Sequence, residues 1–317
     1  MLIEKVEKET KGIKVTVRLE RNVMKLPVFN APRAGYCTCL PKYNLNTYLG
    51  SCAHACIYCY AVKFPSFIGP TSPRLKLLDQ IENMARNTQR KLPVMMSDCT
   101  DPYQPLEKEN KITRRCTEVL TKNGFPLLIV TKSDLVTRDL DVFKETPTVV
   151  SITVTTLRED VANFIEPHAP SPDRRISALQ KVADKGISAV ARIDPIIPTI
   201  NDDENYFERL VSTLADIDVK QVTIATMKPV KGFFSTLKQL NPEVYERVFQ
   251  LYADGKWVVG YKYLPQERRR RLLEKLRPIV LKHELGFASC REGFPQFNTV
   301  LCDGTTYCRN SLNAYFR

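Results

Sequence analysis

The chain has 317 residues, of which 43% are hydrophobic and 26% charged, enough for one large domain with a buried core or a domain with an appendage. Its net charge of +12 favours polyanionic partners such as nucleic acid, although highly charged, thermostable proteins share such a balance. No apolar run reaches the ~18 residues of a membrane helix, and the charged N-terminus lacks the apolar core of a secretion signal. These features argue against a membrane partner and predict a cytoplasmic protein.

Ten cysteines are unevenly spread along the chain. Without a secretion signal they are unlike a disulfide framework, and clustered cysteines in a reducing compartment more often ligate metal. Three groups stand out: Cys37 and Cys39; Cys52, Cys56 and Cys59; and Cys290, Cys302 and Cys308. Cys99 and Cys116 lie apart, and the helical pattern around Cys116 predicts a place in the core.

Residues 1–44 are charged at first and then irregular, which indicates a lead-in segment. Between residues 45 and 230, short runs rich in β-branched residues alternate with amphipathic stretches, as in βαβ units of a parallel sheet. The expected strands are 45–49, 93–97, 127–131, 149–154, 189–193 and 222–227, and the expected helices are 75–90, 113–123, 173–185 and 204–217. Six units predict an α/β fold, a partial (β/α)6 barrel of the TIM type with function at the carboxyl ends of the strands. A doubly wound sheet fits less well, because nothing marks a dinucleotide loop after the first strand.

The pattern changes after residue 230, and residues 231–317 are expected to form a helical, cysteine-bearing extension with helices at 241–251 and 267–281. The second of these carries Arg268, Arg269, Arg270 and Arg271. Four consecutive arginines spread around a helix, so only some can face one partner. Together with the net charge they predict a phosphate-binding face that includes Arg269 and Arg270; the alternative is a solvated helix.

Cys52, Cys56 and Cys59 form the pattern C-x3-C-x2-C on a loop directly after an expected strand. Thiolates are the preferred ligands of iron–sulfur clusters, and three of them on a short loop can hold three irons of a [4Fe–4S] cluster and leave the fourth iron open. The alternatives are a zinc site and unligated core cysteines. Zinc sites usually show two CxxC-like pairs or added histidines, and His54, between two of the cysteines, would make a cramped fourth ligand.

The pattern C-x3-C-x-Y-C-Y resembles the radical S-adenosylmethionine (SAM) superfamily, and more narrowly its spore photoproduct lyase and DNA repair photolyase-like branch. The likeness runs over about residues 45–210, and its further matching segments are 97–107, 131–133, 151–153, 166–175 and 194–198. It implies a [4Fe–4S] cluster held by Cys52, Cys56 and Cys59. It also implies that SAM is bound and reductively cleaved to a 5′-deoxyadenosyl radical.

The resemblance also implies residues that bind SAM. Thr100, Lys132 and Ser151 match positions that contact SAM in the family, and Asp194 matches a position suited to bond the adenosine. The residue types agree, because a lysine that ends an apolar strand needs a partner and hydroxyls bond polar groups. The alternatives are a structural ion pair for Lys132, packing for Ser151 and a turn cap for Asp194.

Tyr58 and Tyr60 flank Cys59 and match tyrosines that lie near the cofactor in the lyase and are implicated in hydrogen-atom transfer. Covering the cluster from water is the alternative, and it is favoured for Tyr58. The lyase's hydrogen-donor cysteine matches Asp98 here, and Cys99 is one position away, where a strand would turn it to the other side. Cys99 is therefore a candidate donor with a structural cysteine as the default, and the departure weakens the case for photoproduct repair itself.

Cys290, Cys302 and Cys308 predict a second metal site, with Cys37 or Cys39 as a fourth ligand if the N-terminal segment packs across the barrel. Iron–sulfur and zinc both suit such thiolates. The leading hypothesis is a radical SAM enzyme that repairs or modifies nucleic acid and receives electrons from a donor such as ferredoxin or flavodoxin. The same chemistry on a protein or small molecule comes second, and a non-catalytic iron–sulfur or zinc protein third.

Overall fold

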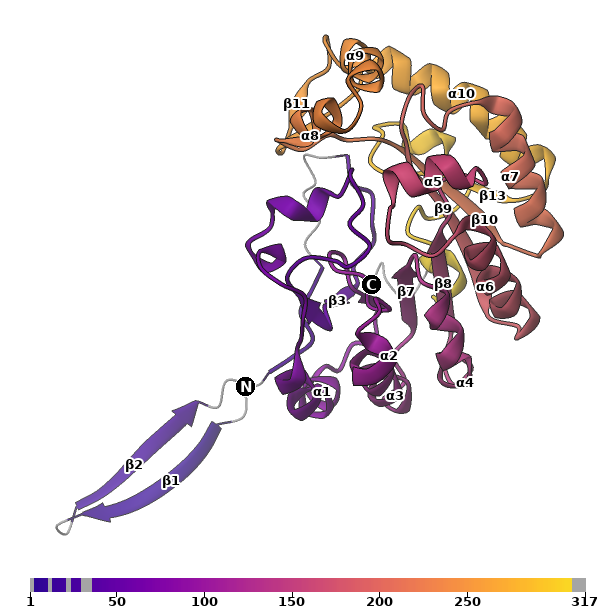
Figure 1. The fold of residues 1–317 in the computed structure, drawn as a ribbon. Coiled ribbons are helices and arrows are strands. Elements are labelled where there is room, and N and C mark those ends of the chain that lie inside the picture. The colour runs from indigo at the N-terminus through magenta and orange to yellow at the C-terminus, as the bar shows by residue number, and fades with distance from the viewer. Residues whose placement is uncertain (1–2, 11–12, 21–23, 30–35, 310–317) are drawn as a thin grey trace.

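A seven-stranded parallel sheet forms the centre of the computed structural model, which describes residues 3–10, 13–20, 24–29 and 36–309 (Figure 1). The strands lie in the order β13-β10-β9-β8-β7-β6-β3, so β13 and β3 form its two ends. Every neighbouring pair is parallel. Their bounds are β3 (Tyr43–Leu45), β6 (Val94–Met96), β7 (Leu127–Thr131), β8 (Thr148–Thr153), β9 (Ser188–Ile196), β10 (Gln221–Thr226) and β13 (Gly286–Ser289).

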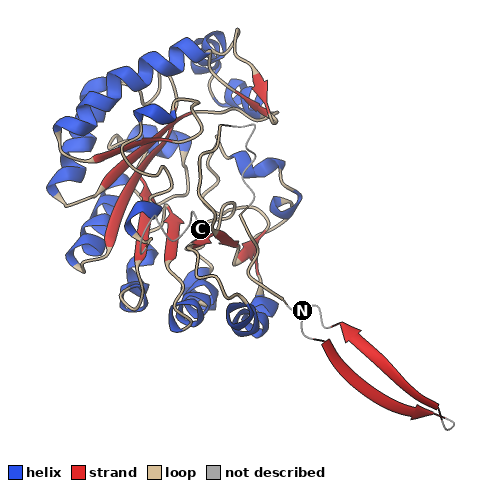
Figure 2. Ribbon diagram, turned by 180° about the vertical axis from the view of Figure 1, so that it is seen from behind, coloured by secondary structure: helices blue, strands red, loops and turns tan. Residues whose placement is uncertain are grey.

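Helices connect the strands and cover the outer face of the sheet (Figure 2). The helices of the fold are α1 (Leu75–Asn87), α2 (Glu107–Asn110), α3 (Ile112–Lys122), α4 (Leu140–Phe143), α5 (Glu159–Ile165), α6 (Pro172–Asp184), α7 (Glu204–Asp216), α8 (Phe233–Leu240), α9 (Pro242–Leu251) and α10 (Gln266–Lys282), of which α8 and α9 lie beyond the end of the sheet (Figure 1). Three small antiparallel pairs complete the fold: β1 (Ile3–Thr10) with β2 (Ile13–Glu20), β4 (Tyr48–Leu49) with β5 (Ser72–Pro73), and β11 (Trp257–Val258) with β12 (Tyr261–Lys262). The β1–β2 pair extends away from the rest of the molecule (Figure 1). Within the described residues no helix has both the length and the apolar character to cross a membrane.

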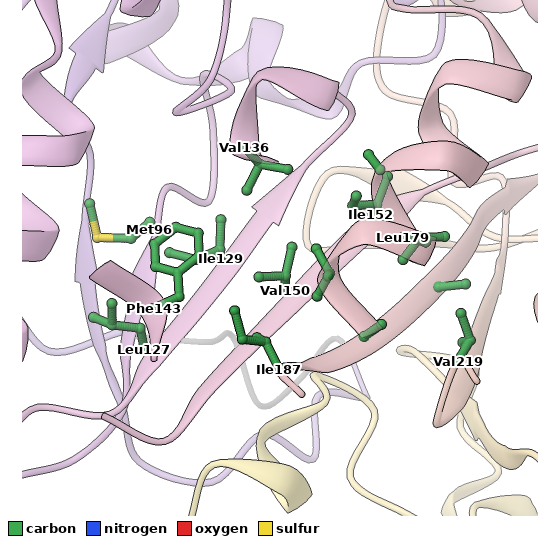
Figure 3. Packing of buried hydrophobic residues seen from close by; sticks show 14 of the residues in the cluster. Met96, Leu127, Ile129, Val136, Phe143, Val150, Ile152, Leu179, Ile187 and Val219 are labelled. Carbon is green, nitrogen blue, oxygen red and sulfur yellow. The ribbon is translucent and has the colours of Figure 1, made fainter. Parts of the chain in front are cut away.

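The two faces of the sheet have different neighbours because strand side chains alternate in direction. Ile129, Val150 and Ile152 belong to the large core cluster between the sheet and its helices, where Leu179 of α6 packs (Figure 3). Their sequence neighbours Leu128 and Val149 belong to a second buried cluster on the inner, concave face of the sheet.

The predicted α/β partial barrel is confirmed, and its sheet has one strand more than the six expected. Residues 286–289 pair with β10 in parallel, so the sheet continues past the boundary expected at residue 230. This strand escapes sequence reasoning because Gly, Ala and Ser make up most of it and carry little β-propensity. The expected strand 45–49 is also divided: Tyr43–Leu45 joins the large sheet, and Tyr48–Leu49 pairs with residues 72–73.

Residues 301–309 lie against the inner face of the sheet. The Thr223 hydroxyl donates to the Cys302 carbonyl oxygen at 3.1 Å. A side chain at Gly304 would crowd Val149 and Val190, because an added Cβ would lie 3.3 and 3.4 Å from their methyl groups, and its φ of +82° also favours glycine. The concave side of the barrel is therefore filled in part by a segment from the other end of the sequence.

Candidate active site

The cysteine loop follows β4 and carries Cys52, Cys56 and Cys59. Its entry requires Gly50, whose φ is +76° and where an added Cβ would lie 2.1 Å from the carbonyl oxygen of Pro70. Electrostatic interactions link Cys56 to both other thiols, and burial raises the pKa of all three, to about 12 for Cys52 and about 11 for Cys56. Binding a metal would remove this cost, because the thiolate charge would then be neutralised.

His54 fixes this loop to the sheet instead of offering a ligand. Its Nε2 lies 3.2 Å from Oδ2 of Asp101, and its side chain is buried. Asp101 also accepts bonds from the Thr131 hydroxyl at 2.6 Å and the Lys132 backbone N–H at 2.8 Å. Burial alone would raise the pKa of Asp101, but the charge and hydrogen bonds of these neighbours lower it to about 2. A carboxylate that sequence reasoning did not assign thus joins the cysteine loop to the end of β7.

Lys132 extends from the end of β7 toward the cysteine loop. Burial lowers its pKa, but the nearby Cys56 and Glu166 outweigh that effect and hold the pKa above its ordinary value. Its Nζ lies 5.5 Å from the ring centre of Tyr58, and among the described residues no carboxylate lies within 4.0 Å of it. A partly buried cation in this state is suited to bind an anionic ligand.

Alternation along the strands places three of the predicted SAM-binding residues on the inner face. Leu128, Val149 and Val190 belong to the inner cluster. Lys132, Ser151 and Asp194 each follow one of them by an even number of positions on the same strand, or directly after it, and so face the same side of the sheet. The Ser151 hydroxyl is buried without a hydrogen-bond partner among the described residues. Asp194 pairs with Arg192 two residues earlier on β9, at 2.6 Å. An orphaned buried hydroxyl beside a cation fits a polar ligand at the carboxyl ends of these strands.

The side chain of Thr100 contacts the backbone of the cysteine loop. Its buried hydroxyl donates to the carbonyl oxygen of Gly50 at 2.9 Å. This bond holds the start of the loop against the segment that follows β6. In the structure the hydroxyl hydrogen of Thr100 is therefore engaged with protein, unlike that of Ser151.

The two tyrosines of the loop have different surroundings. Tyr58 donates to the carboxylate of Glu166, which also forms a buried 2.5 Å ion pair with Arg175. This anchor supports a covering role for Tyr58. Tyr60 is 41% exposed and donates to the backbone carbonyl of Asp98. Next to that carbonyl, Cys99 is partly buried and lies within electrostatic range of Cys59.

The other predicted cysteines separate into two environments. Cys302 and Cys290 interact with each other and with Cys39. Cys308 lies apart from them: its sulfur is 3.8 Å from the Thr305 carbonyl oxygen, and it packs against the inner apolar cluster. The grouping of Cys308 with Cys290 and Cys302 as metal ligands is therefore corrected, because its side chain points into the apolar packing below the turn.

A single metal ion has no ready site in the described part of the chain, because no three Cys, His, Asp or Glu side chains are arranged to hold one. Zinc is therefore unsupported at either cysteine group. A [4Fe–4S] cluster makes no such demand, because each thiolate binds a different iron. The thiols of the loop, the unpaired Lys132 ammonium and the orphaned Ser151 hydroxyl together fit a cluster with a carboxylate-bearing ligand beside it.

The arginine run of α10 does not form one basic face. Arg269 is buried, and its guanidinium donates to the carbonyl oxygens of Leu264 and Glu292. The expectation that Arg269 contacts phosphate is therefore wrong, because its charge and donors are used inside the protein. The next two arginines pair with acidic residues one turn away at 2.8 and 2.9 Å: Arg270 with Glu274, and Arg271 with Glu267.

Comparison with known sequences identifies the family. The sequence model of the Radical SAM superfamily matches residues 47–211, and the chain belongs to this superfamily. An uncharacterized protein of Methanocaldococcus jannaschii is 33% identical over 221 residues, which cover 68% of this chain and 83% of that protein. A phage protein named Radical SAM Nalpha-GlyT isomerase, from Pseudomonas phage M6, is 23% identical over 172 residues and covers 52% of this chain and 36% of that protein.

Comparison with solved structures places the fold beside spore photoproduct lyase. A mutant of that enzyme superposes with a TM-score of 0.64 at 18% identity, covering 85% of this chain and 79% of that chain. A second structure, with bound AdoMet and dinucleoside spore photoproduct, gives a TM-score of 0.62 at 19% identity over 78% and 75% of the two chains. Membership in the superfamily implies a [4Fe–4S] cluster and SAM for this chain.

Sequence reasoning assigned no role to several polar residues that shape the site. Asp101 anchors the cysteine loop, Glu166 and Arg175 hold Tyr58, and Arg192 pairs with Asp194. Each is a charged residue within or next to an apolar stretch, and such residues are almost never buried unless paired. That rule would have flagged them as members of buried networks, but it does not name their partners.

Proposed function

We propose that this protein cleaves SAM reductively and uses the product to repair or modify nucleic acid. One observation carries the first part: beside the cysteine loop, a cation without a carboxylate partner and a buried hydroxyl without a hydrogen-bond partner face the same interior. Buried hydroxyls are normally hydrogen-bonded, so the orphaned Ser151 hydroxyl, on the same face of the sheet as the Lys132 ammonium, supports a ligand site at the carboxyl ends of the barrel strands.

The chain's own residues would divide the work as follows. When bound, the cluster and SAM supply a 5′-deoxyadenosyl radical. Cys52, Cys56 and Cys59 would hold the cluster, Lys132 would bind the SAM carboxylate as a point charge, and Ser151 would bond a polar group of the same ligand. Asp194 would accept from the adenosine while Arg192 fixes its carboxylate.

Neighbouring side chains would shield the site and supply hydrogen. Tyr58 packs with the apolar cluster of α8 and α9, and would exclude water from the loop. Tyr60 would cover the outer side of the loop. Cys99 would be the candidate hydrogen-atom donor, which its position near Cys59 supports.

A basic, aromatic rim beside the cysteine loop supports a nucleic-acid substrate. The Lys63 ammonium lies 3.4 Å from the ring centre of Tyr261, whose ring is 6.4 Å from that of Tyr60. Trp257, 55% exposed, lies on the same β11–β12 pair. Tyr261 is itself buried beneath Lys63, and the exposed rings are those of Tyr60 and Trp257. Exposed rings stack on bases and cations bind phosphates, so this rim suits a single strand or an extruded nucleotide. Spore photoproduct lyase, whose fold this chain shares, has been solved with a dinucleoside photoproduct.

The cellular setting follows from the same chemistry. Reductive cleavage needs an electron donor such as ferredoxin or flavodoxin, and free thiols suit the reducing cytoplasm. The same radical chemistry on a protein or small molecule is the competing assignment.

The first test is SAM cleavage by the anaerobically reconstituted full chain. With dithionite, 5′-deoxyadenosine should accumulate in the wild type and should fall strongly in Ser151→Ala and Lys132→Ala. Lys122→Ala is the control, because Lys122 is exposed at the end of α3, next to the amino ends of the strands. No 5′-deoxyadenosine from an iron-loaded wild type would refute the proposal.

The second test addresses the substrate. Binding to single- and double-stranded DNA and RNA, with and without ultraviolet damage, should weaken steeply with salt because each phosphate contact releases counterions. Lys63→Glu and Trp257→Ala should weaken it further, whereas Lys122→Glu should not. If no nucleic acid shows salt-dependent affinity, the assignment passes to a protein or small-molecule substrate.

A further inference from the structure

Four cysteines from three separate parts of the chain meet outside the cysteine loop. They are Cys37 and Cys39 before β3, Cys290 directly after β13, and Cys302 in the segment on the inner face of the sheet. Side-chain interactions link Cys37 with Cys39, Cys39 with Cys302, and Cys302 with Cys290, and the Thr38 hydroxyl lies 3.9 Å from the Cys302 sulfur. We name these four residues the assembled cysteine group.

Each segment of the group is held by contacts that do not involve sulfur. The Cys290 N–H donates to the Ile224 carbonyl oxygen at 2.8 Å, which fixes Cys290 at the end of β13. The Cys302 carbonyl oxygen accepts from Thr223 at 3.1 Å and from the Arg192 guanidinium at 3.2 Å. Both cysteines are therefore fixed to neighbouring strands of the barrel.

The N-terminal cysteines are held by a buried ion pair. Lys42 and Asp303 approach to 2.7 Å with side chains 1% and 9% exposed. Arg309 adds a bond to the carbonyl oxygen of Pro41 at 3.2 Å. Since Lys42 follows Cys39 closely and Asp303 follows Cys302 directly, this pair brings the two segments together. Exposure of Cys37, Cys39 and Cys290 is intermediate, so the group remains within reach of solvent.

Two fixed cations lie beside the group. Lys42 is near Cys39 and is held by Asp303, and Arg192 is near Cys290 and donates to the Cys302 carbonyl oxygen at 3.2 Å. Fixed positive charge next to sulfur favours the thiolate form in which cysteine binds metal.

Cys116 and Cys308 show how structural cysteines look in the same protein. Both are buried in apolar clusters, and burial raises the pKa of each to about 12. No other cysteine is a cause of either shift. The members of the assembled cysteine group interact with one another and none of them belongs to an apolar cluster, so packing alone does not account for the group.

The donor set indicates the class of metal centre. All four donors are thiols, and thiolates are the preferred ligands of iron–sulfur clusters. In the described part of the chain no three side chains are arranged to hold a single ion, so zinc has no support there. We propose that Cys37, Cys39, Cys290 and Cys302 hold a second iron–sulfur cluster.

Arg192 connects the second site to the first. Arg192 interacts with Cys290 and also pairs with Asp194 at 2.6 Å. The side chain of Asp194 lies on the inner face of the sheet, where SAM is proposed to bind. The second cluster would thus lie one ion pair from that ligand, inside the same barrel. The proposal concerns metal content and does not rest on the proposed substrate or on SAM cleavage.

The test is the iron and sulfide content of full-length chains reconstituted without oxygen. The wild type should hold about eight irons, and Cys52→Ala/Cys56→Ala/Cys59→Ala about four, since each cubane contains four. Cys290→Ser/Cys302→Ser should also hold about four, whereas Cys116→Ser and Cys308→Ser should match the wild type. Mössbauer spectra of the triple variant should show a cluster with four thiolate ligands.

Thiol labelling gives a second readout, which keeps the proposal testable if the Cys290→Ser/Cys302→Ser variant fails to fold. In the loaded triple variant, Cys37, Cys39 and Cys290 should resist iodoacetamide until a chelator removes the iron. Less than about one iron per chain in the triple variant would overturn the proposal. One zinc without sulfide, or a disulfide between any two of the four thiols after anaerobic purification, would overturn it as well. None of these readouts depends on 5′-deoxyadenosine.

Discussion

The two cysteine groups of this protein are built in opposite ways. Cys52, Cys56 and Cys59 lie on one loop, which begins at Gly50 and is held by its own backbone bonds and by side chains from elsewhere in the barrel. The assembled cysteine group draws its members from both ends of the sequence and exists only when the whole barrel is folded. A local site is visible as spacing along the chain, whereas an assembled site is visible only as tertiary contacts.

The two cysteine groups also differ in how much the free energy of unfolding depends on the contacts that hold them. The loop carries its three thiols on one short segment, and several separate anchors hold it, such as His54 with Asp101 and Tyr58 with Glu166. The assembled cysteine group depends on a buried ion pair, and breaking such a pair costs far more than breaking an exposed one. Changes near the loop should therefore affect chemistry with little loss of stability, and changes near the assembled cysteine group should do the reverse.

The largest expected effect is on SAM cleavage after loss of the loop thiols. Replacing Cys52, Cys56 and Cys59 together by Ala should reduce 5′-deoxyadenosine formation below detection, because no other loop residue replaces a thiolate ligand. Circular dichroism and thermal unfolding should change little. Continued SAM cleavage in this variant would contradict the assignment of the loop.

The next largest effect is on stability at the assembled cysteine group. Lys42→Ala should lower the free energy of unfolding by about 3–5 kcal/mol, because Asp303 would remain buried without its partner. Urea unfolding of the metal-free chain measures this. Arg86→Ala is the matched control, since its pair with Glu82 is exposed and spans 4.0 Å, and no change is expected there. A loss below about 1 kcal/mol for Lys42→Ala would show that the ion pair does not hold the segments together.

A smaller effect is expected for the cation beside the loop. Lys132→Ala should weaken SAM binding about 10- to 150-fold, because a hydrogen bond to a charged group contributes about 1.5–3 kcal/mol. Anaerobic calorimetry of the iron-loaded chain provides the measurement. Iron content should stay at the wild-type level, which separates ligand binding from cluster assembly. Unchanged SAM affinity would assign Lys132 to a structural network with Glu166 instead.

The smallest effect is expected at the exposed part of the arginine run. Arg270→Ala should leave stability unchanged, because its pair with Glu274 lies on the surface. Arg269→Ala should be destabilising, because two buried carbonyl oxygens, one of them close to Cys290, lose their donor. Equal melting temperatures for the two variants would contradict the buried role of Arg269.

Regular elements were predictable where one signal dominated. The strand at Leu127–Thr131 was expected with the same bounds, and the helix at Glu204–Asp216 differs by one residue, because continuous apolar runs and a clear helical period identify them. β13 was missed because its residues have weak strand propensity and it is recognised only by its neighbour β10.

The candidate site also has features that the sequence predicts and features that only the tertiary structure shows. The cysteine loop and the inward parity of Lys132 and Ser151 follow from spacing and strand alternation. The exclusion of Cys308 and the pairing of Arg192 with Asp194 do not, since each depends on how a distant segment packs. Sequence spacing suggested that Cys290 and Cys302 belong together, but only the fold separates them from Cys308.

The segment on the inner face of the sheet also has a consequence for synthesis on the ribosome. Strands β3 to β10 emerge before residues 286–309, so the nascent barrel exposes Val149 and Val190 until the last strand and the turn at Gly304 arrive. During that interval the inner face lacks the packing of residues 301–309. A chain truncated at residue 285 should therefore bind a hydrophobic dye that a chain ending at residue 309 excludes.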